Sequence, residues 1–114
     1  MVGERRLFVR FGMSCTVVVQ PDPQDKRTID CELIDLSYEG VGMYSPQAFE
    51  PGGALKFIII NRQLNVNLGG LGRVVYCNPV TVNGKEVFRI GLELIDVDRA
   101  QVKQILMLVR DLSR

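Results

Sequence analysis

Residues 73–95 read RVVYCNPVTVNGKEVFRIGLELI, and this stretch predicts a long β-hairpin. Asn83 and Gly84 stand between two runs that are rich in β-branched and aromatic residues, Arg73 to Val82 and Glu86 to Ile95. Both central residues of a type I′ turn need a positive φ, which Asn and Gly adopt most readily, so this pair is the strongest hairpin signal in the chain. The sequence therefore predicts antiparallel pairing around this turn.

Further strand patterns fill the chain before this hairpin. Turn-forming residues separate them, at Pro21-Asp22-Pro23, Pro51-Gly52-Gly53 and Asn61-Arg62-Gln63. Gly69 to Gly72 interrupt a strand pattern, which indicates a bulge or a sharp bend. The strands are expected at Met13 to Gln20, Thr28 to Leu36, Val41 to Ser45, Ala54 to Ile60 and Leu64 to Leu68.

Only the C-terminal residues show a helical pattern. Asp98 is placed to cap a first turn, with Gln101 three residues later. The apolar stripe that follows has two interpretations, a face packed on a barrel or a surface for a partner. About six antiparallel strands followed by one helix predict a mainly β fold, a small curved barrel. The stripe consists of Val102, Ile105, Leu106, Val109 and Leu112.

Length and charge limit the possible functions. The 114 residues fit one domain, and 14 Lys and Arg against 13 Asp and Glu leave a net charge of only +1. A net charge this small creates no strong overall electrostatic attraction to nucleic acid or to a membrane surface. Any anion-binding site must therefore be a local cluster of charge. The longest apolar runs, Leu55 to Ile60 and Ile105 to Val109, are too short to span a bilayer, and no signal sequence opens the chain. We therefore expect a cytoplasmic protein with no membrane segment.

Cysteine and histidine usage argues against an enzyme. Cys15, Cys31 and Cys77 lie far apart in strand-like stretches, which is typical of buried reduced thiols. The chain has no His, so the usual zinc sites, Cys-His nucleophiles and Ser-His-Asp triads are excluded. Its carboxylates form no recognisable acid/base pair. We expect no catalytic residue, no metal and no cofactor.

Two short motifs are candidates for binding. ERRLFVRF, residues 4–11, holds three arginines that alternate with apolar residues, so it is too apolar for the usual solvated charged tail. DLSYEG, residues 35–40, follows the second predicted strand. Turn chemistry alone explains the second motif, since Asp and Ser bond the local backbone and Gly supplies a positive φ.

Together, Arg6-xxx-Arg10 and Asp35-x-Ser37-xx-Gly40 resemble the RxxxR and [D/N]xSxxG motifs of the PilZ domain, a bacterial receptor module for cyclic di-GMP. With this composition RxxxR is expected by chance in about 0.8 places and DxSxxG in about 0.02, so DxSxxG carries the weight. Two later stretches, residues 72–76 and 91–96, resemble the last barrel strands of the family. The resemblance covers essentially the whole chain.

The resemblance implies one PilZ-like domain over residues 1–114. Its fold would be a six-stranded antiparallel PilZ-type (split) β-barrel with a C-terminal α-helix. The expected parts are an N-terminal arginine switch segment, the barrel and the helix, at residues 1–12, 13–96 and 97–113.

The resemblance also implies a site for cyclic di-GMP. An Arg side chain bonds a phosphate or the O6/N7 edge of guanine with two parallel hydrogen bonds and stacks on a guanine face. Asp35 is the natural acceptor for the N1 and N2 donors of guanine, while Ser37 can donate to the ligand. The implied ligand-binding residues are Arg5, Arg6, Arg10, Asp35, Ser37, Gly40 and Tyr76.

Tyr76 has two interpretations. The family often places an aromatic residue near this position, where it stacks on guanine, but a Tyr that packs within the barrel explains the residue equally well. On a regular strand Arg73 and Tyr76 point to opposite faces unless a bulge intervenes, so at most one is expected to face the ligand.

Arg5 bears on the number of ligands. In the family, a further Arg directly before RxxxR goes with two mutually intercalated cyclic di-GMP molecules, so Arg5 implies two per protomer. The expected function is a receptor or adaptor that changes conformation on binding and signals to an effector protein or a fused module, in motility, exopolysaccharide or virulence output. The alternatives are a PilZ-like adaptor without ligand binding and a small β-barrel that binds nucleic acid, although the latter needs exposed aromatics on a basic face.

Overall fold

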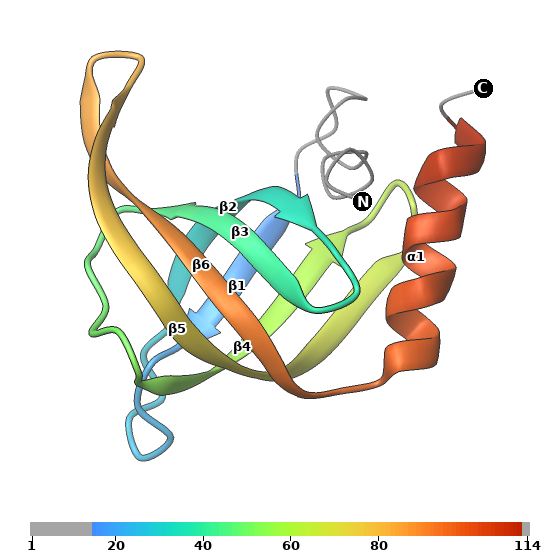
Figure 1. Cartoon of the computed structure of the whole chain (residues 1–114), viewed down its shortest axis with the longest axis horizontal. Coiled ribbons are helices and arrows are strands. Elements are labelled where there is room, and N and C mark those ends of the chain that lie inside the picture. Colours follow the sequence, from blue (N-terminus) through green and yellow to red (C-terminus); the bar gives the residue numbers. More distant parts are fainter. Residues whose placement is uncertain (1–14, 113–114) are drawn as a thin grey trace.

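Residues 15–112 form a closed six-stranded β-barrel with one helix beside it (Figure 1). The computed structural model describes residues 15–112, and side chains up to residue 108. Every neighbouring pair of strands is antiparallel, in the order β1-β2-β3-β6-β5-β4, and the pairing of β1 with β4 closes the barrel. The prediction of a mainly β, antiparallel barrel with a C-terminal helix is confirmed. The elements are β1 (Thr16–Gln20), β2 (Ile29–Leu36), β3 (Gly40–Ser45), β4 (Ala54–Asn61), β5 (Val66–Val82), β6 (Lys85–Val97) and α1 (Arg99–Leu112).

The hairpin of β5 and β6 is the longest pairing in the barrel. Asn83 and Gly84 both have a positive φ, 52° and 79°, as the predicted turn requires. β3 pairs with β6 only as far as Ser45 opposite Phe88, so the tip of the hairpin extends beyond the barrel (Figure 1).

One predicted interruption is absent. Leu64 to Leu68 and Arg73 to Val82 were expected as separate strands, but β5 runs without a break from Val66 to Val82. The glycines between them stay paired with β4 and β6, and the register against β6 shifts at Leu71 and Gly72, so the predicted bulge is confirmed. Leu64 lies in the preceding turn, where its amide donates to Asn61 Oδ1 at 3.0 Å.

Alternate residues of the strands point inward and form the core. α1 contributes Val102 and Ile105, which are buried, and Leu106 packs partly buried against the core, so the described part of the apolar stripe packs on the barrel, while the side chains of Val109 and Leu112 lie outside the described residues. Within residues 15–112, no helix is long and apolar enough to cross a membrane. The largest fully buried side chains are Phe57, Leu36, Met43, Ile59, Leu68 and Ile90.

The three cysteines are free, and the predicted burial is confirmed for two of them. Cys15 and Cys31 are buried and Cys77 is half-buried. Burial raises the pKa of the Cys15 and Cys31 thiols, so both stay protonated at neutral pH and behave as small apolar core residues.

Candidate ligand-binding site

A hollow of about 310 Å³ lies on the barrel where the end of β2, the start of β3 and the middle of β5 and β6 meet. Four of the predicted site residues line it, although 41 positions separate the first from the last in the chain. These four are Asp35, Ser37, Gly40 and Tyr76. The remaining lining residues are Val41, Gly42, Val75, Arg89, Gly91 and Leu92.

Ser37 folds the turn that joins β2 to β3. Its hydroxyl accepts hydrogen bonds from the amides of Glu39 (3.3 Å) and Gly40 (3.1 Å) and donates to the Gly40 carbonyl (3.3 Å). The Ser37 amide donates to the same carbonyl at 2.9 Å. In this structure the hydroxyl proton is therefore used in the bond to the Gly40 carbonyl, and a hydrogen bond from Ser37 to a ligand would have to replace that bond.

Gly40 is needed for a reason other than the one the sequence suggested. The expected positive φ is wrong, because among residues 15–112 the glycines with positive φ are Gly52 and Gly84. Instead, a Cβ on Gly40 would lie only 2.7 Å from the carbonyl oxygen of Leu92. A backbone oxygen in a paired strand cannot move aside cheaply, so glycine allows β3 to approach β6 at this point.

Asp35 presents its carboxylate at the wall of the hollow. A register shift between Leu33 and Asp35 marks a bulge in the pairing of β2 with β3. The carboxylate then lies over Gly42, where a Cβ would come within 2.6 Å of Asp35 Oδ1. Only a glycine in β3 leaves room for this position of the acid.

Arg89 is the cation among the described residues that line the hollow. Its Nη2 lies 3.8 Å from Asp35 Oδ2, which is an ion pair rather than a hydrogen bond. Its guanidinium carbon is 6.0 Å from the centre of the Tyr44 ring. A hydrogen bond to Tyr76 is the main reason why the pKa of Arg89 is raised, with Asp35 contributing less. The guanidinium thus stays charged and is held between two tyrosines and an acid.

Tyr76 reaches the hollow because a bulge intervenes in β5. The register against β6 shifts between Val74 and Tyr76, which leaves Val75 as the extra residue. The Tyr76 ring lies directly over Gly91, where any Cβ would collide with it. Arg73 is instead at the surface and pairs with Glu93 at 3.5 Å. Tyr76, not Arg73, therefore lines the hollow.

Comparison with known proteins identifies the fold that carries this site. A family profile for the PilZ domain matches residues 4–111. The chain belongs to the PilZ domain family. Cyclic di-GMP is the ligand of this family, and the match over residues 4–111 includes both motifs, so the resemblance seen in the sequence led to the right family.

A solved structure shows the same fold. The structure of this PilZ domain is similar to that of Bacillus subtilis Inhibitor of motility (MotI/DgrA), with a TM-score of 0.67 and 16% sequence identity. The match covers 90% of this chain but 48% of that one, so the chain spans about half the length of that protein. A search of curated proteins finds no match. At this identity the structural likeness shows the fold alone.

The remaining predicted residues of the PilZ domain site, Arg5, Arg6 and Arg10, lie outside the described residues. The first described residue is close to the site, however. The carbonyl of Cys15 accepts a hydrogen bond from the Leu33 amide at 3.0 Å, two residues before Asp35. The chain therefore enters the barrel beside the acid.

Arg89 is the residue that the sequence analysis missed. In the sequence, only its position two residues before Gly91 could have indicated a role. The alternation of side chains along that strand does not show which face of the strand lies toward the DxSxxG motif. The pairing of Arg89 with Tyr44 across β3 and β6 brings it to Asp35, and that register is a property of the folded PilZ domain.

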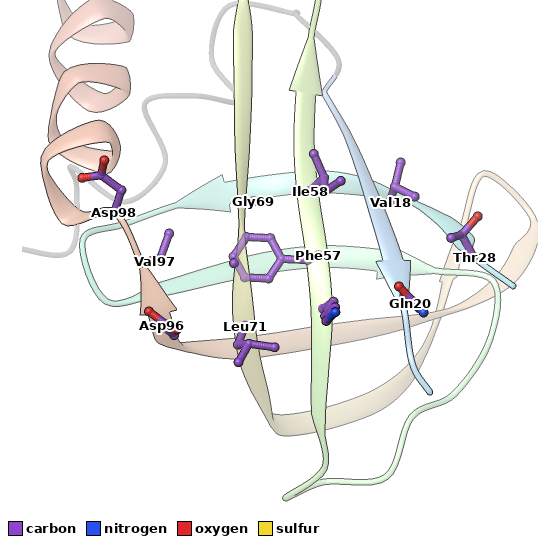
Figure 2. Close-up of a pocket in the computed structure, with 12 residues that line it drawn as sticks. Val18, Gln20, Thr28, Phe57, Ile58, Gly69, Leu71, Asp96, Val97 and Asp98 are labelled. Atoms are coloured by element: carbon purple, nitrogen blue, oxygen red, sulfur yellow. The ribbon is translucent and has the colours of Figure 1, made fainter. Parts of the chain in front are cut away.

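A larger hollow lies elsewhere on the PilZ domain, across β1, β4, β5 and the end of β6 (Figure 2). It measures about 640 Å³, and Val18, Ile58, Leu71 and Val97 give it an apolar wall. Of the predicted site residues that the structure describes, none lines it, and Lys56 is the one cation among its described lining residues. The smaller hollow has the hydrogen-bonding groups that a nucleotide requires, so we consider it the candidate site.

Proposed function

We propose that this PilZ domain is a receptor for cyclic di-GMP and acts as an adaptor, through a change of conformation that an effector protein or a fused module reads. The observation that carries the proposal is the meeting of Asp35, Tyr76 and Arg89 in one hollow beside the Ser37–Gly40 turn. The hollow thus combines an acid, an aromatic ring and a guanidinium around one small space.

These three groups match the chemistry of guanine. The Asp35 carboxylate can accept from the N1 and N2 donors of a guanine edge, and a face of the Tyr76 ring can stack on a base. Arg89 can bond the O6/N7 edge or a phosphate oxygen with two N–H groups. Because the Asp35–Arg89 distance of 3.8 Å is too long for a hydrogen bond, both groups keep bonding capacity for a ligand.

The size of the hollow indicates that it takes only part of the ligand. At about 310 Å³ it lies at the lower end of the ~300 to 1,000 Å³ of small-molecule pockets. Cyclic di-GMP has two guanines and two phosphodiesters, so further contacts must come from outside the hollow. We assign these to Arg5, Arg6 and Arg10.

Chain length allows this assignment. Arg10 precedes Cys15 by five residues, and five residues span at most about 18 Å when extended. Since Cys15 is hydrogen-bonded to Leu33 beside the site, Arg10 is within reach of a ligand in the hollow.

Two ligand molecules would offer one phosphodiester for each available guanidinium group. Two cyclic di-GMP molecules carry four phosphodiester charges, and Arg5, Arg6, Arg10 and Arg89 supply four guanidinium groups. This agrees with the implication of Arg5 that each protomer binds two.

We place the receptor in the cytoplasm, with residues 1–12 as the switch segment of a single domain over 1–114.

Isothermal titration calorimetry tests the proposal. Cyclic di-GMP should bind, while cyclic GMP and GTP should bind far more weakly because neither brings two guanines and two bridging phosphodiesters. A short single-stranded oligonucleotide tests the nucleic-acid alternative. The absence of binding heat with cyclic di-GMP would overturn the proposal. A PilZ-like adaptor that binds no ligand would then be the remaining hypothesis.

A further inference from the structure

Arg99, the first residue of α1, reaches across to the Ser37–Gly40 turn. Its Nη1 donates to the Tyr38 carbonyl, and its Nη2 donates to the Leu94 carbonyl at 3.0 Å. The guanidinium carbon also lies 5.9 Å from the centre of the Tyr38 ring. One half-buried side chain thus joins the turn, the end of β6 and the start of the helix.

The helix itself does not explain an arginine at this position. A cation in the first turn faces the positive end of the helix dipole, which is unfavourable, and the negative charge at this helix end comes from the capping Asp98 rather than from Arg99. The cap of α1 is already supplied by Asp98, whose Oδ1 accepts from the amides of Ala100 (3.0 Å) and Gln101 (3.2 Å). The contacts of Arg99 with the turn are therefore its structural role.

The turn has two sides with different neighbours. Ser37 and Gly40 line the candidate ligand hollow. Tyr38 and Glu39, the two variable positions of DxSxxG, face the end of β6, where the Glu39 carbonyl accepts from the Leu94 amide at 2.9 Å. A displacement of the turn toward or away from the hollow must therefore change the bonds at Arg99.

We infer that Arg99 is a positioning residue that couples the Ser37–Gly40 turn to α1. The inference rests on the proposed function of this turn as part of the cyclic di-GMP site. Coupling of this kind is reciprocal: a ligand that shifts the turn alters the hold on α1, and a change at Arg99 alters ligand affinity.

The position of α1 is open to such an influence. The helix packs on the barrel through Val102 and Ile105, whereas Met107 and Leu108, just past its middle, are 46% and 38% exposed. A change in the anchoring of the first turn would therefore alter how this exposed apolar pair is presented to a partner.

Hydrogen exchange on the ligand-free protein tests the coupling directly. In Arg99→Ala the amides of Glu39 and Gly40 should exchange about fivefold faster, together with those of the first turn of α1. A role confined to the helix would speed exchange in α1 alone. Arg99→Lys should show nearly the same fast exchange as Arg99→Ala, because one ammonium group does not reproduce the planar guanidinium that donates to two carbonyls. Lys103→Ala, an exposed position one turn further along α1, is the control.

The second measurement uses cyclic di-GMP and the full chain. Arg99→Ala should weaken binding about fivefold, at the lower end of usual coupling because the side chain is half-exposed, and the ligand should no longer change exchange in α1. Turn amides that exchange as in the wild type in ligand-free Arg99→Ala would overturn the inference. If the wild type itself takes no cyclic di-GMP, the proposed function fails, and the ligand-free exchange still decides whether the turn and α1 are coupled.

Discussion

Gly42→Ala should displace the Asp35 carboxylate while every side chain proposed to bond the ligand stays chemically unchanged, although the new methyl group lies at the wall of the hollow. A Cβ at this position lies 2.6 Å from Asp35 Oδ1, where ordinary contact begins near 3.4 Å, so the oxygen must move by about 0.8 Å. The obstacle is the far end of a side chain, which can rotate away. The fold should therefore tolerate the methyl group, while the acceptor for guanine leaves its position.

The expected effect follows from the bond that is lost. A hydrogen bond to a charged group contributes about 1.5 to 3 kcal/mol, so the affinity for cyclic di-GMP should fall roughly 10- to 150-fold. The melting temperature should change by less than about 4 °C, which corresponds to roughly 0.5 kcal/mol in a domain of this size. Calorimetry and thermal unfolding measure the two quantities on the same sample.

Two comparisons make the result decisive. Gly69→Ala is the matched control, because the nearest atoms to its Cβ are at 3.6 and 3.7 Å and the position lies in the other hollow, so binding should be unchanged. The double variant Gly42→Ala/Asp35→Ala should bind no worse than Asp35→Ala alone, since both act on one contact. A Gly42→Ala protein that binds like the wild type would refute the role given to Asp35.

Three further substitutions and one labelling experiment test other parts of the site. Arg10→Ala should abolish detectable binding with the fold intact, whereas Arg27→Ala, an exposed arginine paired with a nearby acid, should bind normally; equal binding by both would exclude the arginine from the site. Gly40→Ala should lower the free energy of unfolding by roughly 1 to 3 kcal/mol, because its Cβ meets a backbone oxygen, and a fully stable variant would contradict the close approach of β3 and β6. Arg5→Leu should reduce the calorimetric ratio of ligand to protein from two toward one, and a wild-type ratio of one would refute the two-ligand proposal. On addition of cyclic di-GMP the amides of residues 6–10 should exchange much more slowly, and the same strong protection without ligand would argue against a switch segment.

The local sequence determined most of the secondary structure and the family. The Asn83-Gly84 turn follows from the φ preferences of two residues, and the strands follow from alternation between turn signals, all of which are short-range properties. DxSxxG pointed to the turn for the same reason, because Ser37 folds it through bonds to its own neighbours. These features could be read from the chain because they depend on residues only a few positions apart.

Only the tertiary structure decided how the site is assembled. Tyr76 reaches the hollow through a bulge in β5, and Arg89 meets Asp35 through the register of β3 against β6. Gly40 is required by the oxygen of a neighbouring strand rather than by its own φ. Each of these facts depends on which residues lie opposite one another across paired strands. That pairing results from closing the whole barrel, so no local pattern in the sequence contains it.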